Sequence, residues 1–236
     1  MQNTFHKFNK KTLPFLRQAG AQKDNDWLVE HAIDYEQNLR GPFVALVEQL
    51  KRELSESAFD YHFPIRNLAK INKMAHRVGE GEPVNKDWVS VSAARPPASR
   101  FEHYPHLFFG ILQDQPGWNG IFVTGGLFMP SSAQLKKVRL ALARDAKPFH
   151  ALFADAKFNK RFPHGFSSRQ TGVRTPLGFD PEHPDLKWLK LKNFLVEREV
   201  SVAEFTSAEF FDHVAADFHQ LLKVNRLLEQ ILDADT

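Results

Sequence analysis

The chain has 236 residues, of which 42% are hydrophobic and 25% are charged, so it can bury a core and does not have the composition of a disordered chain. It has no cysteine, which excludes disulfides, thiolate metal sites and a cysteine nucleophile. The net charge is +3, but it is unevenly distributed: residues 66–174 carry 17 basic and 7 acidic side chains, whereas residues 1–65 are at −1 and residues 175–236 at −6. Two interpretations of this basic middle stay open, namely acidic helices that pack around it and a binding site for an anion.

The first part of the chain, residues 24–56, is predicted to be helical. Asp24, Asn25 and Asp26 are candidate N-caps before Trp27. The pair at 41–42, Gly-Pro, interrupts the pattern, and a proline there fits the first turn of a new helix. Apolar residues then follow at helical spacing: Phe43, Leu46, Val47, Leu50 and Leu54.

Residues 66–129 are predicted to be rich in strands. Residues 88–94 alternate with a period of two, and the apolar runs at 107–112 and 120–129 are typical of buried strands. Between these two runs lie the turn signals Pro116-Gly117 and Asn119-Gly120, which predict a β-hairpin.

Residues 131–233 are predicted to be helical again, apart from a loop at 163–183. Ser131 and Gln134 form a capping-box pattern before a stripe of Leu135, Val138 and Leu142. Thr206 and Glu209 form a second such pattern, which predicts the start of the last helix. We therefore expect one α+β domain over residues 1–236, with an antiparallel sheet from the middle of the chain covered by N- and C-terminal helices. The 22 phenylalanines are expected to fill its core.

No standard catalytic, nucleotide-binding or metal-binding motif is present, so the cofactor is unknown and the sequence leaves open whether the protein is an enzyme. His103 and His106, and likewise His213 and His219, lie close in sequence but do not match a standard metal-ligand spacing, and we predict no metal site. The N-terminus lacks the apolar run of a signal peptide, and no segment approaches the ~20 apolar residues of a membrane span. We expect a cytoplasmic protein without a membrane partner.

Basic residues between 66 and 100 give the clearest indication of a binding site. Lys70, Lys73 and Arg77 have spacings of three and four, so they would share one face of a helix but not of a strand. Lysine and arginine recognise phosphate and carboxylate, although a solvated surface is the alternative. Glycines at 125–126 either admit a ligand close to the backbone or allow tight packing, and packing is the commoner role. The candidate ligand contacts are Lys70, Lys73, Arg77, Lys86, Trp88, Arg95, Arg100, Gly125, Gly126 and Arg174.

Three further stretches carry a family resemblance. They are Asp24–Trp27 with Asp34-Tyr35-Glu36, the run Gly125–Pro130, and the run Arg174–Pro184 followed by Leu189–Phe194. In this order they resemble the bacterial domain-of-unknown-function family 2461. The resemblance supports the architecture and implies a basic site, but the family has no assigned activity.

The family's central signature, Arg-x-x-Arg-Asp-x-Arg-Phe followed by Asp/Asn-Lys-x-x-Tyr, is degenerate in this chain. Lys70 and Lys73 stand for the first two arginines, Arg77 for the third, and Asn85-Lys86 for the second half, with Trp88 near the tyrosine position. Met74 stands where the family has aspartate. The resemblance therefore favours anion binding over acid–base catalysis.

We accordingly predict binding of a phosphate- or carboxylate-bearing small molecule. One alternative is an interaction module that docks an acidic protein. Another is nucleic-acid binding, since Trp88, Phe101 and Tyr104 could stack bases, although Glu80, Glu82 and Asp87 dilute the positive charge.

Overall fold

The computed structural model describes residues 4–96, 103–115 and 118–234. The chain before the sheet forms α1 (Thr12–Gly20), α2 (Trp27–Glu30), α3 (Ala32–Tyr35), the π-helical turn η1 (Glu36–Arg40), α4 (Gly41–Glu53) and the 3-10 turn η2 (Ala75–Arg77). The sheet consists of β1 (Trp88–Ala94), β2 (His106–Gln115), β3 (Trp118–Leu127) and β4 (Phe194–Val200). Between β3 and β4 lie α5 (Ser132–Arg144), α6 (Lys147–Ala154), α7 (Ala156–Arg161) and α8 (Leu186–Leu189), and after β4 come α9 (Val202–Phe205) and α10 (Phe210–Asp233).

The four strands form one antiparallel sheet in the order β1-β2-β3-β4, which confirms the predicted α+β class. β1 has the predicted bounds, and β2 and β3 pair as the predicted hairpin, with Gln115 opposite Trp118. The predicted turn pair 116–117 lies outside the described residues. The other predicted turn pair, Asn119-Gly120, lies inside β3, so it does not form the turn.

The fourth strand arises where the sequence indicated only helices. β4 pairs with the outer edge of β3, with Phe194 opposite Leu127 and Val200 opposite Ile121. Its burial does not follow a simple alternation, because Phe194, Leu195 and Val196 are buried in succession and Val200 is buried again at the end of the strand. The segment therefore lacks the period of two by which a strand is predicted from sequence.

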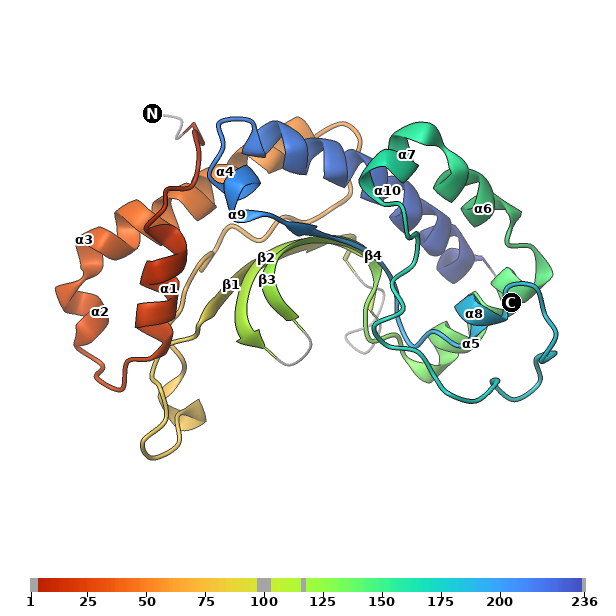
Figure 1. Cartoon of the computed structure of the whole chain (residues 1–236), viewed down its shortest axis with the longest axis horizontal. Helices are drawn as coiled ribbons and strands as arrows, with labels where there is room; N and C mark the ends of the chain where they lie inside the picture. Colours follow the sequence, from red (N-terminus) through yellow and green to blue (C-terminus); the bar gives the residue numbers. More distant parts are fainter. Residues whose placement is uncertain (1–3, 97–102, 116–117, 235–236) are drawn as a thin grey trace.

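The helices cover one face of the sheet, which is its convex face (Figure 1). α10 lies across β3, and α4 and α9 lie on the same side. The closest approach is at Gly125, where an added Cβ would lie 2.7 Å from Cβ of Leu221. Within the described chain, Figure 1 shows no helix over the concave face. The covering helices are thus N- and C-terminal, as predicted.

Phenylalanine fills the space between these helices and the sheet. The largest fully buried side chains are almost all phenylalanines, among them Phe8, Phe109 and Phe210. The rings of Phe8 and Phe205 stack with centroids 4.3 Å apart, and Phe109 and Phe210 lie 5.8 Å apart. This packing joins the segment before α1 to the sheet and to the C-terminal helices.

Of two predicted helix boundaries, one is confirmed and one is wrong. α4 begins at Gly41 with Pro42 in its first turn, as predicted, although the π-helical turn η1 runs directly into it without a break. A side chain at Gly41 would place Cβ 2.6 Å from the Glu36 carbonyl oxygen, so glycine fits this turn. The last helix does not begin with a capping box at Thr206; the Thr206 hydroxyl instead donates to the Val202 carbonyl oxygen at 3.0 Å.

Other caps follow the sequence more closely. The capping box of Ser131 and Gln134 at the start of α5 is confirmed. Asp26 is the N-cap residue of α2, but its side chain does not bond the helix; the Asp24 carboxylate instead accepts from the Asp26 backbone N–H at 2.9 Å.

Candidate functional site

The concave face of the sheet carries a cavity of about 310 Å³. Side chains alternate between the two faces of a strand, so the residues opposite the buried core positions line this concave pocket. Its lining residues are Trp88, Ser90, His106, Phe108, Leu112, Gln115, Trp118, Thr124, Phe128 and Leu195. The pocket is therefore mainly aromatic and apolar, with a few polar groups, as is typical of ligand-binding sites.

A glycine shapes the floor of the pocket. Gly110 follows Phe108 on the same face of β2, and an added Cβ there would lie 2.7 Å from the Phe108 ring and 3.3 Å from Cβ of Ser90. The Phe108 ring therefore lies over the Gly110 backbone instead of standing out from the sheet. This arrangement leaves an open, flat aromatic surface in the centre of the pocket.

The pocket continues on the β4 side into a smaller hollow that shares Trp118, Phe128 and Leu195 with it. There the Arg169 guanidinium lies 5.0 Å from the Trp118 ring centroid, and its Nε donates to Glu197 Oε1 at 2.5 Å. The positive charge at this rim is thus matched by a carboxylate.

The side of the pocket at Trp88 differs, because the positive charges near it have no carboxylate partner among residues 4–96, 103–115 and 118–234. Lys86 Nζ lies 4.5 Å from the Trp88 ring centroid and 3.5 Å from the Lys70 carbonyl oxygen. Burial lowers the pKa of Lys86, and the charges of Arg77 and Lys70 lower it further. We call Lys70, Arg77 and Lys86 the open cationic cluster.

The ion pairs of the described chain involve other cations: Arg40, Arg95, Arg161, Arg169, Arg198, Arg226 and three histidines. In the described part of the chain, no member of the open cationic cluster forms an ion pair with a carboxylate.

For the segment that carries the open cationic cluster, the sequence allows a helix or a strand. The structure shows a paired loop instead. Asn72 and Asn85 form an isolated antiparallel bridge, and the backbone N–H of Lys86 donates to the Ile71 carbonyl oxygen at 2.8 Å. Lys73 Nζ donates to the Pro83 carbonyl oxygen at 2.8 Å and so ties the two arms together. This paired loop brings Lys70 close to Lys86, 16 residues away.

The structure gives the remaining predicted contacts other surroundings. Arg95 pairs with Asp60, Glu229 and Asp233, at 2.7 Å for Asp233. Gly125 packs against α10, and Gly126 has a φ of +125° with its α-carbon facing the Phe194 carbonyl oxygen. Arg174 is exposed, and Arg100 lies outside the described residues. Of the predicted set, Trp88 lines the pocket, Lys86 contacts Trp88, and Lys70 and Arg77 lie near enough to Lys86 for their charges to act on it.

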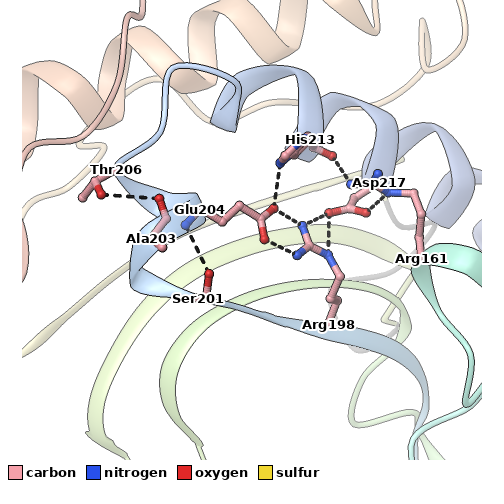
Figure 2. Close-up of polar contacts among 8 residues, drawn as sticks. All are labelled: Arg161, Arg198, Ser201, Ala203, Glu204, Thr206, His213 and Asp217. Atoms are coloured by element: carbon pink, nitrogen blue, oxygen red, sulfur yellow. Dashed lines mark hydrogen bonds and ion pairs between the residues drawn. The ribbon is translucent and has the colours of Figure 1, made fainter.

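A second cluster of charged groups lies on the helix-facing side of β4 (Figure 2). Asp217 of α10 is fully buried between Arg161 and Arg198, and Arg198 also binds Glu204 through two hydrogen bonds of 2.7 and 2.8 Å. Nδ1 of His213 lies 3.2 Å from Glu204. We call these five residues the closed ion network, because each cation in it meets a carboxylate.

The pKa values of the closed ion network reflect this matching. Burial by itself would raise the pKa of Glu204, but the hydrogen bonds and charge of Arg198 outweigh it and lower that pKa. Burial opposes the charge of Arg198 as well, and its bonds to Glu204 and Asp217 nevertheless raise its pKa. Arg198 and Glu204 therefore keep their charges, and the network joins α7, β4, α9 and α10.

Comparison with known proteins identifies the family. A family model described as "Conserved hypothetical protein (DUF2461)" matches residues 11–226. The chain belongs to the DUF2461 family. No curated protein and no solved structure matches it.

Two general properties of this DUF2461 chain follow from the described residues. None of its helices there is both long and apolar enough to cross a membrane. Over the same residues, no group of three or more histidine, aspartate and glutamate side chains lies close enough together to hold a metal ion.

Sequence reasoning on this DUF2461 chain missed most of the pocket. Of its lining residues, only Trp88 was predicted. Phe108 and Leu112 lie in the run 107–112 that was interpreted as a buried strand, and His106 directly precedes it, whereas all three line an open face. Their alternation with Leu107, Phe109 and Ile111, which are buried, could not be seen in sequence because both sets are mainly apolar.

Proposed function

We propose that the protein binds a small ligand that combines a flat apolar body with a phosphate or carboxylate group. The body lies in the concave pocket and the anion contacts the open cationic cluster. The observation that carries the proposal is the position of Lys86, whose Nζ lies over the ring of Trp88. One residue of the pocket wall is thus in direct contact with the cluster.

The shape and lining of the pocket support the first half of the proposal. Its volume of about 310 Å³ is at the lower end of the range, roughly 300–1,000 Å³, that is usual for small-molecule sites. Trp88, Trp118 and Phe108 offer ring faces and edges, against which a planar group packs well.

The electrostatics support the second half. Burial, and then the charges of Arg77 and Lys70, disfavour the charged form of Lys86 and lower its pKa. A bound phosphate or carboxylate would interact with all of these charges and raise that pKa again. Binding should therefore be accompanied by proton uptake at any pH between the pKa of free Lys86 and its higher pKa in the complex.

A nucleic acid is the second candidate, because an open sheet face with exposed rings can stack successive bases. An acidic protein could use the same cations. Both bind through many solvent-exposed charges, so salt should weaken them strongly. A small anion held at a partly buried lysine should depend less on salt.

The test is isothermal titration calorimetry with 1-naphthyl phosphate, 1-naphthol, inorganic phosphate and a short oligothymidylate, each at low and high salt. We expect 1-naphthyl phosphate to bind more tightly than either of its two parts. Trp88→Ala and Lys86→Ala should each weaken it about tenfold, or about 1.4 kcal/mol. Lys51→Ala, an equal charge change on α4 at the convex side, is the control.

Equal affinity in the wild type and in both pocket variants would overturn the proposal. Tight binding of the oligothymidylate that disappears at high salt would favour the nucleic-acid alternative instead.

A further inference from the structure

His106 is the imidazole of the concave pocket. It is the first residue of β2, lies opposite Gly126 of β3 and Ala94 of β1, and lines the cavity together with Phe108 and Thr124. The neighbouring strands β1 and β3 therefore pair with it on both sides, which fixes its backbone position in the pocket.

The neighbours of the ring determine where its hydrogen lies. Nδ1 of His106 is 3.4 Å from the Tyr104 carbonyl oxygen. A carbonyl oxygen can only accept a hydrogen bond, so Nδ1 carries the hydrogen in this contact. In a neutral imidazole the other nitrogen, Nε2, then has a free lone pair and is an acceptor.

The surroundings keep the ring neutral. Burial lowers the pKa of His106, the contact with Tyr104 opposes this, and the nearby His103 lowers it slightly further. No carboxylate contributes to this balance. Among the described residues, no group donates a hydrogen bond to Nε2. An acceptor without a donor thus lines an otherwise mainly apolar cavity.

The pocket has three other polar side chains. Gln115, the last residue of β2, uses its amide N–H groups on Asp87 and on the Gln113 carbonyl oxygen, at 2.8 and 3.2 Å, so its Oε1 is a second acceptor at the opposite end of the strand from His106. Ser90 and Thr124 have hydroxyls that rotate and can donate as well as accept, so they do not select for a donor.

We infer that His106 Nε2 accepts a hydrogen bond from an N–H or O–H group on the apolar body of the ligand. The inference rests on the proposed function and narrows it: the ligand is an anion whose ring system bears a donor, such as a phenol or a nitrogen heterocycle with a ring N–H. A ligand of the same shape without the donor leaves Nε2 buried and unpaired, which weakens its binding.

The first arm of the test needs no ligand. Long-range ¹H–¹⁵N NMR of the full chain distinguishes the two neutral tautomers and the charged form of a histidine, and His106→Phe assigns the signal. We expect a neutral ring with hydrogen on Nδ1 at pH 7. A hydrogen on Nε2, in either the other tautomer or the charged form, would overturn the inference.

The second arm compares two probes of the same shape and charge. Indole-3-acetate has a ring N–H, and 1-benzothiophene-3-acetate has sulfur in its place. We expect the indole to bind about threefold to tenfold more tightly, since a neutral hydrogen bond contributes about 0.5–1.5 kcal/mol. His106→Phe should remove this difference, while His106→Gln, which keeps an acceptor, should retain part of it.

The outcomes separate the two proposals. Equal affinity of both probes in the wild type, or a preference that His106→Phe leaves intact, contradicts the role of His106 while leaving the pocket itself supported. Failure of both probes and of 1-naphthyl phosphate to bind contradicts the proposed function and, with it, the ligand contact of His106, whatever the tautomer of the ring.

Discussion

The protein carries positive charge in two different arrangements. In the closed ion network, Arg161 and Arg198 meet Asp217 and Glu204 at the interface between β4 and the C-terminal helices. In the open cationic cluster, Lys86 contacts Trp88 of the concave pocket, and burial together with the charges of Arg77 and Lys70 lowers the pKa of Lys86. The same residue types thus join elements in one place and leave charge unmatched in the other.

The contrast divides the basic middle of the sequence into two parts. Arg95 and Arg161 belong to it and pair with acidic residues of α10, so helix packing around a basic centre accounts for them. Lys70 and Lys86 belong to it as well, but without carboxylate partners in the described chain. The two interpretations of the charge asymmetry thus apply to different residues, and an anion site is proposed only for the second part.

The largest expected effect comes from removing the buried acid of the closed ion network. Asp217→Asn leaves Arg161 and Arg198 without their shared charge partner, so we expect the free energy of unfolding to fall by about 3 kcal/mol. Urea denaturation measures it. Asp212→Asn, an exposed position on the same helix, should change it by less than about 0.5 kcal/mol. Equal losses in both variants would show that the network contributes nothing specific.

Lowering the pH should weaken the ion pairs that Asp60 and Glu204 form. The pKa values of Asp60 and Glu204 are lowered in the folded protein, Asp60 chiefly by its hydrogen bond from Arg226 and Glu204 by Arg198. The unfolded chain then binds protons at a higher pH than the folded chain does. Their contribution is therefore complete above the ordinary carboxyl pKa values of 3.8 and 4.5 and is lost as the pH falls through the lowered ones.

Urea denaturation from pH 7 down to pH 3 measures this loss. Glu204→Gln should reduce the dependence of stability on pH, because it removes one of the two carboxyls. Glu56→Gln, at an exposed position, is the control and should leave the dependence unchanged. A pH dependence that is the same in Glu204→Gln as in the wild type would contradict the assignment.

The smallest expected effect on stability comes from a substitution in the open cationic cluster. Lys86→Met keeps an unbranched apolar side chain beside Trp88 but removes a charge that burial and its neighbours disfavour. We expect the free energy of unfolding to stay within about 0.5 kcal/mol of the wild type, or to rise, while binding of 1-naphthyl phosphate weakens. A loss of unfolding free energy as large as that of Asp217→Asn would show instead that Lys86 stabilises the fold.

The strands that could be predicted from sequence are those in which local alternation is visible. β1 was located at its bounds because small polar residues such as Ser90 and Ser92 alternate with Val89 and Val91. β4 was missed because its seven residues lie far along the chain from the hairpin that they join. Pairing with β3 makes this segment a strand, and that contact is not encoded in its local period.

The family, the hairpin, the α5 cap and the amount of positive charge could be predicted from sequence, because motifs, periodicity and composition are local properties. Which charges are matched and which face of the sheet is open depends on tertiary contacts. Arg226 and Asp60 are 166 residues apart, and Arg161 and Asp217 are 56 apart, yet each pair is in contact. The packing of α10 on the sheet brings such partners together. The concave face of the sheet, which carries the pocket, is the face that this packing leaves uncovered.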